Sequence, residues 1–311
     1  SNSIWMRRIR RLSSLRERLK KQRQELEQLR QKLEGLQSQE HLPDNPVEFA
    51  HNFFQVKAFG YQQKLAAAFT KFLTIVVRWS RQTGKSYFVA ILLIWYALKH
   101  PGVEIGIVGP SLRQAKLYIQ RINGLLSKIP SGYYERPFRK TLVRFQNGSL
   151  IQAFPNNPET IRGHTLHAVC WTEMNFTPDD MDMYDAISYA MATTNGIFIG
   201  ESTPWTRNHL FYRMFTDDEA YPPREVFRSH ISWRNAVRPK GPLDPKFVER
   251  KKRETASDPS RWQREMEAEW AEDEDLYFPL DLASGCLGTE KNIGVDLEYI
   301  PEELFFTGLG D

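Results

Sequence analysis

Residues 79–86, with the sequence Trp-Ser-Arg-Gln-Thr-Gly-Lys-Ser, could hold the phosphates of a nucleotide. This loop follows an apolar run at 73–77 and precedes a second apolar run, so it connects a predicted strand to a predicted helix. Backbone N–H groups at a helix N-terminus face the ligand, and the helix dipole adds about half a positive charge there. Gly84 would let the backbone approach closely, Lys85 would reach the β- and γ-phosphates, and the Ser86 hydroxyl would bind Mg²⁺. The predicted binding residues are Ser80, Arg81, Gln82, Thr83, Gly84, Lys85 and Ser86.

One position of this loop departs from the usual pattern of phosphate-binding loops. The first glycine of Gly-x-x-x-x-Gly-Lys-[Ser/Thr] is replaced by Trp79. The alternative interpretation of residues 84–86 is an ordinary turn that contains a glycine. The predicted strand before the loop and the apolar helix after it favour the nucleotide site.

Glu173 is the candidate for the acidic residue that such a site needs on a neighbouring strand. Four apolar residues at 168–171 precede Thr172 and Glu173, so the carboxylate would stand at the C-terminal end of a buried strand. We expect Glu173 to orient and activate the attacking water. Thr172 occupies the place of the aspartate that usually binds Mg²⁺, and its hydroxyl could hold the metal only weakly or through water. The alternative is a solvent-exposed glutamate at a strand end.

Two further motifs have the chemistry of a nucleotide site. Ser202, Thr203 and Pro204 end the next apolar run, where the hydroxyls could hydrogen-bond the γ-phosphate or its water and signal its loss. Gln62 precedes the loop, and its amide both donates and accepts hydrogen bonds, so it could read the edge of adenine. The alternatives are a strand end closed by proline and a glutamine on a helix face.

Two arginines could stabilise the charge of a phosphoryl transition state. Arg81 lies inside the loop, and Arg162 lies eleven residues before Glu173. Each could equally be an ordinary surface arginine.

The elements that must position these residues alternate between strands and helices. The pattern predicts strands at 73–77, 103–108, 166–171 and 196–200, a hairpin of 142–145 and 149–154, and helices at 85–98 and 113–122. Such alternation is typical of an α/β fold with a mainly parallel sheet. After about residue 215 the sequence becomes more polar and proline-rich, and a charged helical tract at 244–272 predicts a smaller subdomain.

The composition excludes several classes of protein. The 311 residues are 41% hydrophobic and 26% charged, as in a globular protein, and two cysteines cannot form a disulfide scaffold. The longest apolar run has twelve residues, at 87–98, whereas a membrane span needs about 20. The N-terminus lacks the apolar core of a signal peptide. We therefore expect a soluble, intracellular protein without a membrane partner.

The N-terminal arm differs from the rest of the chain in charge and in pattern. Residues 1–40 carry eleven Lys and Arg against five Glu, a net charge of +6, which leaves −2 for the remaining residues. Seven of eight consecutive heptad core positions are leucine, namely Leu12, Leu15, Leu19, Leu26, Leu29, Leu33 and Leu36. This pattern predicts a coiled coil or a helical hairpin. The leucine seam favours a protein partner over DNA, and a solvated helix is the alternative.

These motifs together resemble the large terminase subunit of tailed double-stranded DNA viruses. That family's adenine-binding motif, Walker A loop, Walker B strand and coupling motif are matched, in order and spacing, by Tyr61-Gln62, residues 80–86, the strand ending in Glu173, and Ser202-Thr203-Pro204, with Arg162-Gly163 between the second and the third. The tract 262–279 resembles the end of the family's lid subdomain. The resemblance covers roughly residues 54–279.

The resemblance implies a RecA-like ATPase fold with a small lid subdomain, and ATP and Mg²⁺ as cofactors. The predicted domains are a helical arm at 1–42, an ATPase core at 47–215, a lid or linker at 216–279, and a linker with the start of an RNase H-like nuclease domain at 280–311. Asp311 would be the first metal ligand of that nuclease, and Asp296 is a weaker candidate. Because the other nuclease acids do not follow, we expect no nuclease activity.

The resemblance also implies partners. ATP hydrolysis would drive double-stranded DNA into procapsids in the host cell cytoplasm, from a ring of copies docked on the portal protein, with the small terminase subunit as a further partner. On the family's pattern Arg162 would act on the neighbouring subunit's ATP, and Arg81 within its own subunit. Candidate DNA contacts are Arg136, Arg139, Lys140, Arg144, Lys251, Lys252 and Arg253. The alternatives are a helicase-like DNA translocase and a scaffolding protein with a degenerate nucleotide site.

Overall fold

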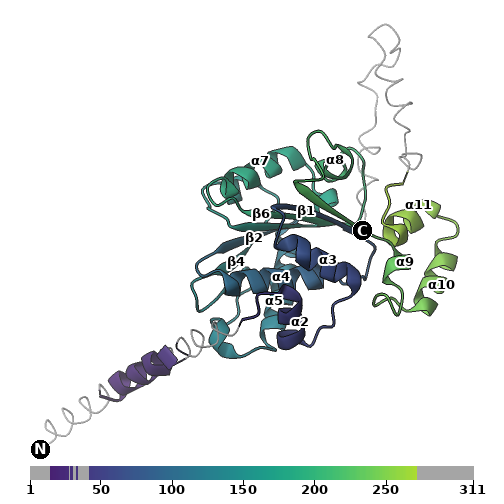
Figure 1. The fold of residues 1–311 in the computed structure, drawn as a ribbon. Helices are drawn as coiled ribbons and strands as arrows, with labels where there is room; N and C mark the ends of the chain where they lie inside the picture. Colours follow the sequence, from purple (N-terminus) through teal and green to yellow (C-terminus); the bar gives the residue numbers. More distant parts are fainter. Residues whose placement is uncertain (1–14, 28, 31–32, 34–41, 272–311) are drawn as a thin grey trace, which may run out of the picture. The chain divides into compact units, whose positions relative to one another are not determined.

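The computed structural model describes residues 15–27, 29–30, 33 and 42–271 (Figure 1). The chain divides after Trp270 into two compact units. The strands and helices given below all belong to the first unit. Among the described residues, no helix is both long enough and apolar enough to cross a bilayer.

A seven-stranded sheet forms the centre of the fold, in the order β3-β4-β2-β5-β6-β1-β7. Its strands are β1 (Thr74–Trp79), β2 (Glu104–Val108), β3 (Leu142–Arg144), β4 (Leu150–Phe154), β5 (Ala168–Thr172), β6 (Ile197–Ser202) and β7 (Val226–Ile231). All neighbouring strands are parallel except β3 and β4, which form the predicted antiparallel hairpin. β5 and β6 are buried along their whole length, as their apolar runs require. The predicted mainly parallel α/β fold is therefore confirmed.

Helices cover both faces of the sheet (Figure 1). One face packs against α2 (Pro46–Phe54), α3 (Gly60–Phe69), α4 (Lys85–Lys99) and α5 (Leu112–Leu126). The other face packs against α7 (Asp180–Met191) and α8 (Leu210–Thr216), and the short helix α6 (Pro158–Ile161) precedes β5. Because α4 is apolar around most of its circumference, it lies in the core directly behind the loop after β1.

Several elements were not predicted from the sequence, including β7 and, among the helices, α2, α3, α6, α7 and α8. β7 lies at the edge of the sheet, and its sequence mixes apolar residues with Arg228 and His230. It nevertheless pairs with β1 along its full length. The predicted ATPase core, 47–215, therefore omits one strand of the sheet.

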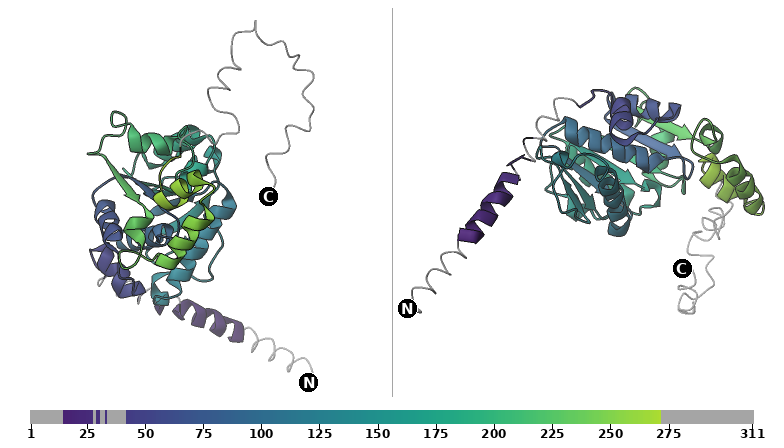
Figure 2. Two further views of the ribbon diagram at one scale, coloured as in Figure 1. Left: turned by 90° about the vertical axis from the view of Figure 1, so that its right-hand side faces the viewer. Right: turned by 90° about the horizontal axis from the view of Figure 1, so that it is seen from below.

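The predicted helical tract at 244–272 consists of several short helices in the part that the structure describes. They are α10 (Pro245–Glu254), α11 (Pro259–Trp262) and a π-helical turn (Gln263–Glu267), and α9 (Trp233–Ala236) precedes them. Pro259 starts a new helix because proline lacks the N–H that a continuing helix would need. The yellow-green helices α10 and α11 lie together at one side of the sheet in Figure 1 and in the right-hand view of Figure 2.

The N-terminal arm is helical over residues 15–27. The leucines of its heptad pattern that the structure describes are exposed, namely Leu15, Leu19, Leu26, Leu29 and Leu33. Leu12 and Leu36 lie outside the described residues. The coiled coil stays a prediction.

Candidate active site

Trp79 ends strand β1, and this explains why it can replace the first glycine of the loop pattern. Its side chain is fully buried, and its Nε1 donates a hydrogen bond to Ser229 Oγ of β7 at 2.7 Å. The indole also meets the Tyr61 ring edge to face, with ring centroids 4.8 Å apart. The backbone is still extended at this position, so the turn itself begins only at Ser80.

The loop after Trp79 ends in a glycine whose backbone conformation favours that residue. Gly84 has φ 80° and caps α4, which begins at Lys85. A Cβ at position 84 would lie 3.1 Å from Gln62 Nε2. The loop is braced by hydrogen bonds from Thr83 Oγ1 to the Ser80 carbonyl and from the Tyr61 hydroxyl to the Thr83 carbonyl, each 2.8 Å long.

Gln62 supports the loop from behind. It is buried, its Oε1 accepts from the Phe59 N–H at 3.0 Å, and its Nε2 lies against Gly84. Gln62 does not belong to the lining of the cavity described next. Its role in reading adenine stays a prediction.

The predicted phosphate-binding residues line one cavity of about 270 Å³. All seven of them do so, and four residues from elsewhere complete the wall: Tyr87, Arg121, Glu173 and Thr203. The cavity therefore brings together the loop, the proposed catalytic carboxylate and one residue of the predicted coupling motif. Lys85 is nearly buried, which keeps its ammonium group in a confined space.

Glu173 follows β5 and turns out of the strand direction. Its backbone is left-handed, with φ 50° and ψ 40°, a conformation that is uncommon for residues other than glycine. Its Oε2 is buried and has no hydrogen-bond partner in the part of the chain that the structure describes. The carboxylate thus stands in the cavity wall, with an acceptor available for a ligand or a water molecule.

Glu201 is a second carboxylate beside the cavity that the sequence analysis assigned no role. It is fully buried on β6, and its Oε1 accepts from Thr172 Oγ1 at 2.9 Å. Burial raises the pKa of Glu201, the Lys85 ammonium lowers it, and the Glu173 carboxylate raises it again. The charge inside an otherwise apolar strand was a usable signal, because unpaired buried glutamates are rare.

Arg121 was also missed. It projects from α5 into the cavity wall and lies over the Tyr118 ring, with its guanidinium carbon 5.5 Å from the centroid. The sequence offered little to distinguish it, because it occupies the polar face of an amphipathic helix, where an arginine is ordinary.

The two arginines that were predicted from the sequence lie in different surroundings. Arg81 lines the cavity and contacts the π-helical turn, through its N–H to the Glu265 carbonyl at 3.0 Å and an ion pair with the same residue at 3.6 Å. Arg162 is outside the cavity lining, has a side chain that is 60% exposed, and pairs with Glu159. An exposed guanidinium is compatible with action on another subunit, but the role stays a prediction.

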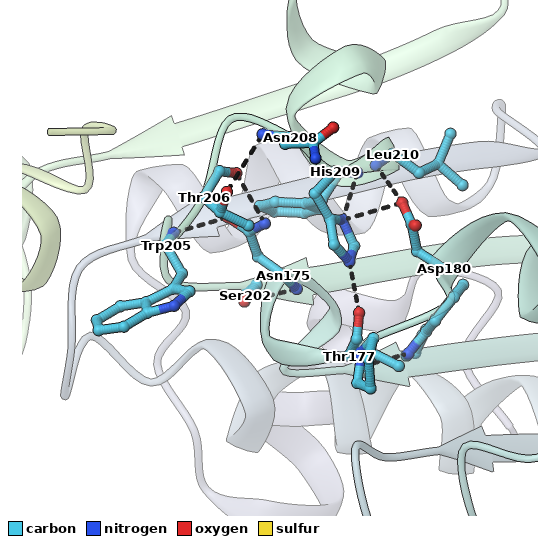
Figure 3. Close-up of polar contacts among 12 residues, drawn as sticks. Asn175, Thr177, Asp180, Ser202, Trp205, Thr206, Asn208, His209 and Leu210 are labelled. Atoms are coloured by element: carbon cyan, nitrogen blue, oxygen red, sulfur yellow. Dashed lines mark hydrogen bonds and ion pairs between the residues drawn. The ribbon is translucent and has the colours of Figure 1, made fainter. Parts of the chain in front are cut away.

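Asn175 connects the turn after β5 to the coupling motif (Figure 3) and, through Trp270, to the C-terminal end of the first unit. Its backbone N–H donates to Ser202 Oγ at 3.2 Å. Its Oδ1 accepts from the Trp205 N–H at 2.7 Å and from Trp270 Nε1 at 2.9 Å, and its Nδ2 donates to the Thr206 carbonyl at 3.1 Å. One buried side chain therefore joins three segments that are far apart in the sequence.

His209 forms a second connection in the same region (Figure 3). Its Nε2 donates to the Thr177 carbonyl at 2.9 Å, and its Nδ1 accepts from the Phe211 N–H at 3.0 Å. The Leu210 N–H donates to the Asp180 carboxylate. Burial lowers the pKa of His209 most strongly, and the contacts with Thr177 and Phe211 suit the neutral imidazole. By contrast, the Asp180 carboxylate, 3.6 Å from Nδ1, raises the pKa of His209.

The oxygen atoms around the cavity fit a Mg²⁺ ion that shares its coordination with phosphates. The part of the chain that the structure describes contains no cluster of three or more His, Cys, Asp or Glu that could hold a metal ion alone. Ser86 lines the cavity, and Glu173 Oε2 and Glu201 Oε2 are buried without partners. Mg²⁺ prefers such oxygen ligands and usually combines one or two carboxylates with phosphates and water. The predicted nuclease ligand Asp311 lies outside the described residues.

A comparison with protein-family models decides the family. Residues 78–284 match the family described as the terminase large subunit, T4likevirus-type, N-terminal. The chain belongs to this terminase family. The match covers the whole phosphate-binding loop, Glu173, the coupling motif and the helices α9 to α11.

Solved terminase structures share the fold. The large terminase ATPase domain of Thermus phage P74-26 is 18% identical, with a TM-score of 0.57 over 74% of this chain and all of that chain. The large terminase of bacteriophage HK97 is 14% identical, with a TM-score of 0.62 over 73% of this chain and 55% of that one. A large terminase from a thermophilic bacteriophage in complex with ADP is 15% identical, with a TM-score of 0.56 over 69% of this chain and 54% of that one.

This terminase chain thus has the fold of the ATPase domain, the motor domain of viral DNA packaging. It spans about half the length of the HK97 protein and of the terminase solved with ADP.

Proposed function

We propose that this terminase domain hydrolyses ATP and uses the free energy to translocate double-stranded DNA into viral procapsids. One observation carries the proposal: the phosphate-binding loop and the Glu173 carboxylate line the same cavity. The ADP complex of a terminase with the same fold supports a nucleotide as the ligand.

The main polar groups of the cavity wall have separate roles in this proposal. The N–H groups of the loop and Lys85 hold the phosphates, and the Ser86 hydroxyl holds Mg²⁺, which neutralises charge on the phosphate oxygens. Glu173 accepts a proton from the attacking water through its unpartnered Oε2. Arg81 lies on the same wall and stabilises the transferring phosphoryl group within its own subunit.

The coupling motif transmits the loss of the γ-phosphate to the lid. Thr203 lines the cavity, and Ser202 Oγ accepts a hydrogen bond from the Asn175 N–H. Asn175 in turn binds Trp270 Nε1, so a shift of the strand end after β5 moves the segment after the π-helical turn. Pro204 follows directly and fixes the direction of the chain.

The proposed partners are double-stranded DNA, other copies of this chain in a ring, the portal protein and the small terminase subunit, in the host cell cytoplasm. DNA contacts would be made to phosphates, independent of sequence and weakened by salt. The candidate residues near the β3–β4 hairpin, Arg136, Arg139, Lys140 and Arg144, are exposed, as are Lys252 and Arg253 of α10, whereas Lys251 is partly buried and pairs with Glu265.

Steady-state ATP turnover tests the proposal. Glu173→Gln keeps the size of the side chain but cannot accept a proton, so turnover should fall about 10²- to 10⁴-fold while nucleotide binding persists. A Lys85→Ala variant should lose binding as well. Wild-type protein that neither binds nor hydrolyses ATP would favour the scaffolding alternative. Turnover stimulated by DNA but not by procapsids would favour the helicase-like one.

A further inference from the structure

Glu201 is a candidate to replace the aspartate that normally holds Mg²⁺ at the end of the Walker B strand. That position is Thr172 in this chain. The Thr172 hydroxyl donates a hydrogen bond to Glu201 Oε1 at 2.9 Å. Thr172 therefore orients a carboxylate on the adjacent strand.

The register of the sheet puts Glu201 beside the missing aspartate. Thr172 of β5 is paired with Glu201 of β6, and Glu201 is paired on its other side with Val77 of β1. β6 thus lies between the Walker B strand and the strand that leads into the phosphate-binding loop. An acid at position 201 is displaced from the usual site by one strand, toward the loop.

The side chain also points to the correct face of the sheet. Successive residues of a strand face opposite sides, and Ile197 and Ile199 of β6 belong to the core that contains α4. Phe198 belongs to the core on the other face. Glu201 therefore faces α4, whose first residue is Lys85. The Lys85 ammonium and the Ser86 hydroxyl both lower the pKa of Glu201, in agreement with this placement.

One oxygen of Glu201 has no partner within the described residues. Glu201 is fully buried, and its Oε2 makes no hydrogen bond. Burying a carboxylate oxygen without a partner is costly, and native proteins rarely keep one unless a ligand, water or ion satisfies it. Glu201 itself is not part of the cavity lining, but Lys85 and Ser86, the first residues of the helix that Glu201 faces, do line the cavity.

We propose that Glu201 takes over the role of the absent Walker B aspartate and that, oriented by Thr172, it holds Mg²⁺ at Ser86 through the water molecules of the ion. Glu173 is then free to act on the attacking water alone. This inference rests on the proposed nucleotide site. It assigns two functions to two carboxylates that lie on neighbouring strands.

Binding of a fluorescent ADP analogue, measured with Mg²⁺ and with EDTA, tests the inference without relying on turnover. Wild-type protein should bind the analogue more tightly with Mg²⁺ than without it. Glu201→Gln should lose about 10- to 100-fold of that enhancement, the usual cost of removing an outer-sphere metal partner, and should bind as the wild type does in EDTA. A titration of Mn²⁺ into the ADP complex, followed by electron paramagnetic resonance, should show the same loss of metal affinity.

Two variants serve as matched comparisons. Glu104→Gln removes a carboxylate of the same sheet that contacts His164 and lies outside the cavity lining, and it should keep the full Mg²⁺ enhancement. The double variant Thr172→Asp/Glu201→Gln moves the acid back by one strand, to the register partner, and should regain the enhancement that Glu201→Gln loses.

The outcomes separate this inference from the proposed function. If the wild type binds no nucleotide, the proposed function fails, and this inference fails with it. If the wild type shows the Mg²⁺ enhancement and Glu201→Gln keeps it in full, only the role of Glu201 is overturned. If Glu201→Gln does not bind nucleotide even in EDTA, the double variant Thr172→Asp/Glu201→Gln is the deciding test. If that double variant binds the ADP analogue no more tightly with Mg²⁺ than with EDTA, the proposed role of Glu201 is also overturned.

Discussion

At the scale of single residues, Glu173 combines a catalytic position with a strained backbone. A left-handed conformation costs a residue with a Cβ roughly 1–2 kcal/mol, and glycine avoids most of this cost. Glu173 adopts it directly after β5, and the resulting turn places the carboxylate in the cavity wall. The strain thus belongs to the geometry that the active site needs.

Glu173→Gly should therefore be more stable than Glu173→Ala, by about 1 kcal/mol in the free energy of unfolding. Both variants lose the carboxylate, so the comparison isolates the backbone. Urea denaturation of the two proteins measures the difference, and neither should hydrolyse ATP. Equal stability of the two variants would mean that the left-handed turn at 173 is not strained.

Some residues of the site could be predicted from their own type and spacing, and others could not. The phosphate-binding loop and Glu173 were predicted because their types and spacing have a direct chemical meaning, and the cavity contains them all. Glu201 was missed because its significance depends on the pairing of β5 with β6, which no local pattern specifies. Arg121 was missed because it is far from the loop in the sequence, and only the packing of α5 places it in the cavity wall.

At the scale of elements, the strands inside the sheet and the β3–β4 hairpin at one edge were predictable, whereas β7 at the other edge was not. β5 and β6 are buried on both faces, so their sequences are nearly unbroken apolar runs. β7 is an edge strand with polar residues on one side, and its sequence resembles a loop. The breaks between α10, α11 and the π-helical turn follow from Pro259 and from tertiary contacts, such as that of Arg81 with Glu265.

The connection between the turn after β5 and α8 depends on a neutral histidine and should therefore depend on pH. Burial lowers the pKa of His209 below its ordinary value of 6.5. As the pH falls below 6.5, the unfolded chain takes up a proton that the folded chain resists. The contribution of the neutral His209 ring to the free energy of unfolding should thus be fully present above this pH. It should decrease below this pH, by at most about 1.4 kcal/mol per pH unit.

Urea denaturation at pH 7.5 and pH 5.5 checks this prediction, with His209→Gln as the comparison. Glutamine lacks the titrating ring, so the variant should lose less stability between the two pH values than the wild type. Other titrating groups contribute to both proteins and cancel in the difference. An identical loss in both proteins would show that His209 does not titrate in this range.

At the scale of the whole molecule, the two candidate arginines differ in whether they need a neighbouring chain to act. Arg81 lines the cavity of its own chain and is held by Glu265. Arg162 lies outside that cavity with an exposed side chain. If copies form a ring in which each supplies one arginine to the next, Arg162 can act only in the assembly, whereas Arg81 acts within one chain.

Mixing experiments with procapsids distinguish the two roles. Arg162→Ala should abolish turnover, by about 10³- to 10⁵-fold for an arginine finger, and should leave ATP binding intact. Lys85→Ala chains cannot bind ATP but still carry Arg162, so mixing the two inactive proteins should restore part of the activity. Arg81→Ala mixed with Lys85→Ala should restore none, because Arg81 serves its own site. Rescue in the second mixture and not in the first would reverse the two assignments, and an absence of rescue in both would count against a finger supplied by a neighbour.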